Sequence, residues 1–134
     1  MPMPKGMVSI LKIVGVVTLV LMILFATGIY YMTRGLDETR SLEIGQLNLS
    51  DVPNGTYFGE YVGYRWSNQV EVTVLDQTIK AVTPVQNQAF HMEDPINLLI
   101  NSILTKQSLD VDMTSGATAS SKAFLKAVEN ALTL

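Results

Sequence analysis

A run of small and hydroxylated residues near the C-terminus carries the strongest chemical signal in this sequence. It begins at Asp112, reads Asp-Met-Thr-Ser-Gly-Ala-Thr-Ala-Ser-Ser, and leads directly into an amphipathic segment. This order predicts a loop that feeds the first turn of a helix. Such a turn presents unpaired backbone N–H groups and a partial positive charge, which together favour an anion such as phosphate. The loop is therefore a candidate phosphate site.

The side chains of this loop also suit phosphate. Gly116 and Ala117 are small enough to let a ligand approach the main chain. Hydroxyl groups that can donate hydrogen bonds to phosphate oxygens lie at Ser115, Thr118, Ser120 and Ser121. A Ser/Thr-capped helix after a glycine turn uses the same residue types and is the more common case. Residue types alone thus leave a phosphate site and a simple helix cap both open.

Three strands are expected upstream of this loop. They lie at 56–64, 70–74 and 79–85, with turns at 65–69 and 76–78. Gly59 and Gly63 inside the first strand indicate a bulge or a close backbone approach. Pro84 places the end of the third strand at a sheet edge. Strand, turn, strand, turn, strand is an antiparallel β meander.

Two helices should complete this small domain. Asp94 can cap the first, with Pro95 in its first turn. Its apolar stripe is Ile96, Leu99, Ile100 and Ile103. The second helix starts near Ala119 and has an apolar face of Phe124, Ala127, Val128, Ala131 and Leu132. Its polar residues Lys122, Lys126 and Glu129 are expected to face water. Residues 109–112 are a candidate short strand. The predicted fold class is α+β.

An uncharged, apolar run from Ile13 to Thr33 predicts a transmembrane helix before this domain. At ~1.5 Å per residue it is roughly 30 Å long, which matches a bilayer core. A buried core helix rarely runs so long without a charge. A cleavable signal peptide has a shorter apolar region and a small-residue cleavage site, which Ala26-Thr-Gly28 supplies only poorly. The run therefore favours an uncleaved anchor, with Tyr30 and Tyr31 as interfacial aromatics.

Basic residues indicate the orientation of this anchor. Lys5 and Lys12 precede the span, whereas Arg34 and Arg40 after it are accompanied by two carboxylates. This bias predicts a cytoplasmic N-terminus and an extracytoplasmic C-terminal domain in the cell membrane.

The resulting organisation has three parts. Residues 1–33 form a cytoplasmic stub and the transmembrane helix, 34–53 a juxtamembrane linker, and 54–134 the domain. The helix is expected to continue to about Glu43, with Gly45 as its stop.

Composition narrows the classes of function. The chain has no cysteine, which excludes disulfides, cysteine-ligated iron–sulfur clusters and cysteine-attached haem. Its one histidine, His91, is expected in a loop and cannot build a metal site alone. No nucleophile–histidine pair supports hydrolase chemistry, so no catalytic residue and no metal ligand are predicted. The net charge of −3 argues against nucleic-acid binding.

The motif Asp-x-x-Ser-Gly-Ala-Thr-x-Ser at 112–120 resembles the flavinylation motif of the FMN-binding domain family. This family includes the flavin-carrying C subunit of the sodium-pumping NADH:quinone oxidoreductase and the G subunit of the Rnf complex. In the family, the threonine that ends Ser-Gly-Ala-Thr is bonded to the FMN phosphate. The resemblance thus implies a covalent FMN on Thr118.

A second stretch, Asn-Gly-Thr-Tyr-x-Gly-Glu at 54–60, is similar to the family's opening Asp-Gly-Thr-Tyr-x-Gly-Glu. The resemblance covers roughly 51–132. It departs from the family at Asn54, at the hairpin turn 77–78 and in the loop 87–93. Part of that loop can line the flavin ring in the family, so the motif does not define the ring contacts here.

The resemblance also implies a partner enzyme, and the aromatic residues of the chain offer candidate contacts for the flavin ring. A flavin transferase that uses FAD and a divalent metal should attach the cofactor. Asp112 serves recognition by this enzyme, positions the loop, or simply caps a turn. Tyr57 and Trp66 are candidate stacking partners of the flavin ring, although each also suits core packing.

These features predict a membrane-anchored extracytoplasmic electron-transfer flavoprotein. Electrons would pass from a membrane donor through the tethered FMN to an external or periplasmic acceptor, so an electron carrier or redox subunit is favoured over a stand-alone enzyme. Two alternatives stay open. One is a subunit of a larger ion-translocating redox complex, although such family subunits have a longer outer part. The other is a flavin-free surface binding module.

Overall fold

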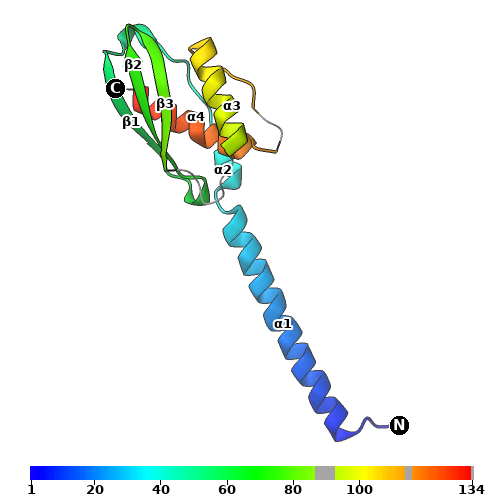
Figure 1. Cartoon of the computed structure of the whole chain (residues 1–134). Coiled ribbons are helices and arrows are strands. Elements are labelled where there is room, and N and C mark those ends of the chain that lie inside the picture. The colour runs from blue at the N-terminus through cyan, green and yellow to red at the C-terminus, as the bar shows by residue number, and fades with distance from the viewer. Residues whose placement is uncertain (87–92, 114–115, 134) are drawn as a thin grey trace. The chain divides into compact units, whose positions relative to one another are not determined.

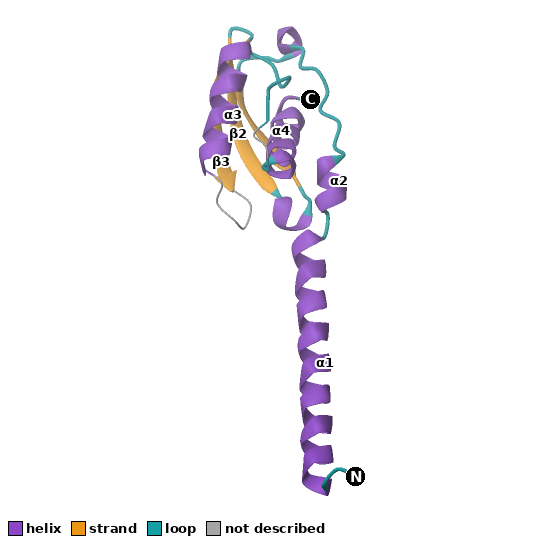
Figure 2. Ribbon diagram, turned by 90° about the vertical axis from the view of Figure 1, so that its right-hand side faces the viewer, coloured by secondary structure: helices purple, strands orange, loops and turns teal. Residues whose placement is uncertain are grey.

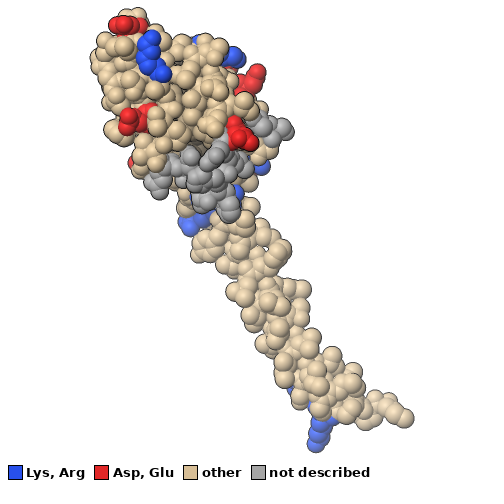
Figure 3. All heavy atoms as spheres, in the orientation of Figure 1, with Lys and Arg blue, Asp and Glu red and all other residues tan. Residues whose placement is uncertain are grey.

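The computed structural model describes residues 1–86, 93–113 and 116–133 and divides the chain into two compact units, Met1–Arg34 and Gly35–Leu134. The first unit is a single helix, α1 (Lys5–Thr33), none of whose residues is buried (Figure 1). By length and composition this helix can cross a membrane. Its surface is uncharged over most of its length on the face shown in Figure 3. These properties support a single membrane anchor, as the sequence predicts.

The helix does not continue to Glu43, contrary to the prediction. It ends at Thr33, and a short second helix, α2 (Leu36–Arg40), begins after Gly35. Gly35 has φ +79, in the left-handed region that glycine adopts without steric cost. This glycine therefore ends the continuous helix ten residues before the expected stop at Gly45.

The sheet has three antiparallel strands in the order β1-β2-β3, which confirms the meander. The strands are β1 (Gly55–Tyr61), β2 (Asn68–Leu75) and β3 (Thr78–Gln86). Asp76 and Gln77 join β2 to β3, and both have positive φ, as a two-residue type I′ hairpin requires. β3 is an edge strand, which accommodates the missing N–H of Pro84. The segment expected as a turn at 65–69 is instead a 3₁₀ turn, η2 (Tyr64–Trp66), and β2 begins after the single residue Ser67.

Two helices share one apolar core with this sheet, so the fold is α+β (Figure 2). α4 (Thr118–Leu132) packs on β1 and β2, and α3 (Glu93–Lys106) contacts β3 and α4. The apolar face predicted for α4 is buried. The central strand contributes three fully buried valines, Val70, Val72 and Val74.

Two local predictions differ from the structure. α3 begins at Glu93, so Asp94 lies inside its first turn instead of capping it. Residues 109–112 form no strand. Leu109 and Val111 are nevertheless buried in the core, so side-chain burial rather than strand pairing holds this segment in place.

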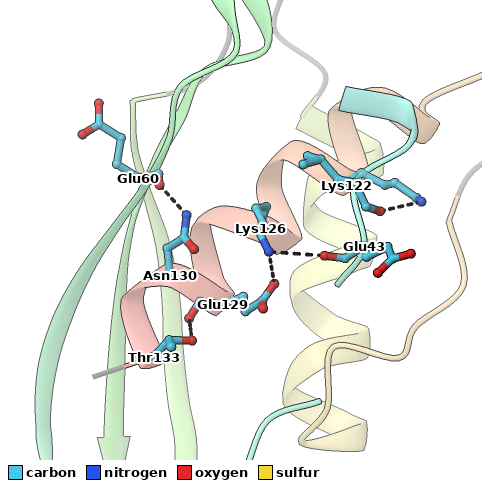
Figure 4. A network of polar contacts seen from close by, with 8 residues as sticks. Glu43, Glu60, Lys122, Lys126, Glu129, Asn130 and Thr133 are labelled. Carbon is cyan, nitrogen blue, oxygen red and sulfur yellow. Dashed lines mark hydrogen bonds and ion pairs between the residues drawn. The ribbon is translucent and has the colours of Figure 1, made fainter. Parts of the chain in front are cut away.

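The segment expected as a linker, 34–53, packs on the domain from residue 35 onward. Val52 is buried in the core, and Ile44, Leu47 and Leu49 pack against it. Lysines of α4 also hold its backbone (Figure 4). Lys122 Nζ donates to the Leu42 carbonyl over 2.8 Å, and Lys126 Nζ donates to the Glu43 carbonyl over 3.3 Å. Both lysines are half-buried, so they do not simply face water as predicted.

A partly buried hydrogen bond fixes α2 to the sheet. Thr39 is fully buried, and its Oγ1 lies 2.8 Å from the hydroxyl of Tyr61 on β1. We expect Thr39→Val to lower the free energy of unfolding by about 1–2 kcal/mol, because the partly buried Tyr61 hydroxyl loses its partner.

Fluorescence of the single tryptophan, Trp66, can follow unfolding of the full chain in detergent. Tyr61→Phe tests the same bond from the other side. The loss in the Thr39→Val/Tyr61→Phe double variant should be smaller than the sum of the two single losses. Strictly additive losses would show that this bond does not hold α2.

Candidate functional site

The N-cap position of α4 holds a residue without a polar side chain. Its N-cap residue is Ala117, which makes no side-chain cap hydrogen bond. Gly116 before it has φ +84 and nothing near the position of a Cβ atom. The first helical residue, Thr118, is exposed. Because alanine has no side-chain acceptor, the N-cap residue itself does not compete with an anion for the first-turn N–H groups. Residues 114–115, just before Gly116, lie outside the described part of the chain.

A cavity of about 450 Å³ lies at this helix start. Leu36 and Arg40 line it from α2, and Arg65 and Trp66 line it from η2. The start of α4 contributes Gly116, Thr118, Ala119 and Ser120. The volume lies within the range of small-molecule sites, roughly 300–1,000 Å³.

Trp66 is a buried residue that lines this cavity. Its side chain is 8% exposed and packs against Ala119 and Ala123 of α4. Its indole Nε1 finds no acceptor among the described residues. A buried donor without an acceptor costs about 1–3 kcal/mol, so a ligand that supplies an acceptor gains stabilisation here.

The charge of the cavity is opposite to that of the chain. Arg40 and Arg65 line it, and none of the described lining residues is acidic, although the chain carries a net charge of −3. The guanidinium carbon of Arg65 lies 4.4 Å from the ring centroid of Trp66, a cation–π contact. With the N-terminal end of the α4 dipole, these two cations favour an anionic ligand.

The structure brings several of the predicted site residues together. Thr118, Gly116, Ser120 and Trp66 all line the cavity. Ser120 is buried, with 1% of its surface exposed, and Ala117 is buried at the N-cap. Ser115 lies outside the described residues.

Two other predicted residues lie elsewhere. Asp112 is exposed and is not among the cavity residues. Tyr57 packs against the main core, and its hydroxyl donates to the Pro53 carbonyl over 2.6 Å. Neither contributes to the cavity in this conformation. The sequence-based prediction in turn missed Leu36, Arg40 and Arg65. For Arg65 a signal existed, because it directly precedes Trp66.

Comparison with protein families matches residues 63–133, more than half of the 134-residue chain, to the FMN-binding domain. The chain belongs to the FMN-binding domain family. The match contains the start of α4 and η2, and it supports FMN binding by this chain. It begins after the 54–60 stretch and leaves out α2. No curated protein matches the chain.

The residues at the cavity fit FMN. The exposed hydroxyl of Thr118 and the start of α4 suit the phosphate, as do the two arginines. Trp66 offers an apolar ring to the rest of the cofactor, and its N–H group has no acceptor among the described residues. These residues can therefore hold an FMN by its phosphate.

Proposed function

We propose that this protein is a membrane-anchored, extracytoplasmic electron-transfer flavoprotein that carries FMN covalently through a phosphoester to Thr118. The observation that carries the proposal is the position of Thr118. Its side chain is exposed at the start of α4, on a cavity lined by two cations and no acidic residue among those described. An anionic phosphate attached there is stabilised by the helix dipole and by the arginines.

Attachment of the flavin is a phosphoryl transfer in which Thr118 is the acceptor. The Thr118 oxygen forms a bond to the phosphorus on the riboflavin side of FAD, and the pyrophosphate P–O bond breaks. AMP leaves and the hydroxyl proton passes to solvent or to the transferase. A divalent metal on a separate flavin transferase supports this step, as the family resemblance implies. Asp112, exposed six residues before Thr118, is available for recognition by that enzyme.

A covalent link suits the proposed location. Free FMN is scarce outside the cytoplasm, so a reversibly bound cofactor would be lost by mass action. The bound flavin supplies one- or two-electron chemistry, and the protein holds it near the membrane through α1. The donor is then a membrane redox component, and the acceptor is an external or periplasmic one. Lys5 and Lys12 before the span support a cytoplasmic N-terminus.

The full chain, co-expressed with an active flavin transferase, should gain the mass of FMN minus one water. It should also keep its flavin fluorescence on a denaturing gel, because only a covalent bond survives unfolding. An unmodified mass beside a demonstrably active transferase would contradict the proposal and favour a flavin-free binding module.

The proposed topology has its own test. Protease added to protoplasts or spheroplasts, in which only the cytoplasmic membrane remains as a barrier, should digest the domain from outside and leave α1 protected. Protection of the whole chain, with digestion only after the membrane is opened, would place the domain in the cytoplasm.

A further inference from the structure

We propose that α2 forms part of the flavin site and that its Arg40 binds the flavin phosphate together with Arg65. This inference rests on the proposed attachment at Thr118. Its new element is α2 with Arg40, which the family match does not include because that match begins at residue 63. The segment directly after α1 would then be part of the cofactor site and not a spacer.

The first argument is that α2 is built into the domain. Thr39 is fully buried and bonded to Tyr61, and Leu36 packs against the cluster that contains Trp66. Leu36 and Arg40 are four residues apart, so they lie on one face of α2. Both line the cavity beside Thr118. A helix fixed in this way presents Arg40 from a defined position.

The second argument is the chemistry of the lining. Guanidinium groups carry planar sets of donors that match phosphate oxygens, and their charge is permanent. The contact of Arg65 with the Trp66 ring limits the positions that its guanidinium can take. Trp66 adds an independent sign of a ligand, because its buried Nε1 has no acceptor among the described residues.

The third argument is the charge that the phosphodiester brings. FMN attached through one phosphate to Thr118 retains one negative charge beside the cavity. Arg40, Arg65 and the N-terminal end of the α4 dipole supply the opposite charge at the same cavity.

The test uses the full chain loaded by an active transferase, with the variants Arg40→Gln and Arg65→Gln. Lys80→Gln is the matched control, since Lys80 is exposed on β3 and does not line the cavity. The readout is the ³¹P NMR resonance of the single phosphodiester, which reports directly on contacts of the phosphate. We expect this resonance to shift in each arginine variant and to keep its position in Lys80→Gln.

An unshifted resonance in both loaded arginine variants would overturn the inference while leaving the attachment at Thr118 intact. Absence of flavin from the unaltered chain would instead overturn the proposed function, so the two failures are distinguishable. If Arg40→Gln loads too little flavin for NMR, Arg40→Lys replaces it. Lysine keeps the charge but lacks the planar set of donors. The Arg40→Lys variant should therefore load with flavin, and its ³¹P resonance should differ from that of the unaltered chain. A loaded Arg40→Lys variant with the same ³¹P resonance as the unaltered chain would overturn the role of Arg40.

Discussion

Thr118→Val is expected to abolish the covalent flavin and leave the domain folded. Valine has nearly the shape of threonine but no hydroxyl oxygen, so no phosphoester can form at this position. Thr118 is exposed, and the free energy of unfolding should therefore change by no more than about 0.5 kcal/mol. Flavin fluorescence on a denaturing gel measures the loss, and Trp66 fluorescence shows that the fold is kept.

Two variants separate the loss of the hydroxyl from other effects of the substitution. Thr118→Ser keeps the hydroxyl and should still accept FMN. Thr105→Val removes an exposed threonine hydroxyl from α3, away from the cavity, and should load like the unaltered chain. Covalent flavin retained at full level in Thr118→Val would contradict the assignment of the acceptor.

The second large effect is expected at Gly59, where β1 lies against α4. A Cβ atom at this position would collide with the carbonyl oxygen of Ala127 and lie 2.6 Å from the backbone nitrogen of Ala131. Both obstacles are helix backbone, so neither can move away cheaply. We expect Gly59→Ala to lower the free energy of unfolding by about 1–3 kcal/mol or more. That is a large share of the roughly 5–15 kcal/mol typical of a domain.

Denaturant unfolding of the full chain in detergent, followed by Trp66 fluorescence, measures this loss. Phe58→Ala is the matched control because Phe58 is the preceding residue on β1 and is 70% exposed. It should change stability by no more than about 0.5 kcal/mol. A Gly59→Ala variant as stable as the unaltered chain would show that β1 and α4 are not in close contact.

Local patterns were enough to predict the meander and the last helix. Val70, Val72 and Val74 alternate with polar residues, and this period of two belongs to a strand buried on one face. The close backbone approach predicted from Gly59 is also present in the structure. The period of two depends on neighbours within a few residues, which a single sequence displays, whereas the glycine marks a close approach without naming the distant residues that make it.

The segment 35–53 was harder to predict because its partners are distant in the chain. Thr39 is bonded to Tyr61, and Leu42 accepts a hydrogen bond from Lys122, 80 residues later. A polar stretch with scattered aliphatic residues therefore looks like a linker in sequence although it packs on the domain. No local pattern reveals which distant side chains will cover it.

The candidate site shows the same difference between residues that are close in the sequence and residues that are distant. The motif identified Thr118 and the start of α4, because those residues are contiguous. Tyr57 was grouped with Trp66 by proximity in sequence, but it lies four residues before Tyr61 on β1. At about 3.3 Å per residue this is roughly 13 Å along the strand. Of these two tyrosines, only Tyr61 packs with Trp66 and Ala119. Tyr57 is hydrogen-bonded to Pro53 near the other end of β1. Arg40 was not predicted as a site residue because the segment that contains α2 was interpreted as a linker.

The most direct test of the central claim is to locate the flavin within the chain. Trypsin releases residues 107–122 as one peptide, since no lysine or arginine lies between Lys106 and Lys122. This peptide contains Thr118 and several other hydroxyl groups. Fragmentation of the flavin-bearing peptide should assign the added FMN to Thr118. Assignment to Ser120 or to another hydroxyl, or an unmodified peptide from cells with an active transferase, would contradict the account.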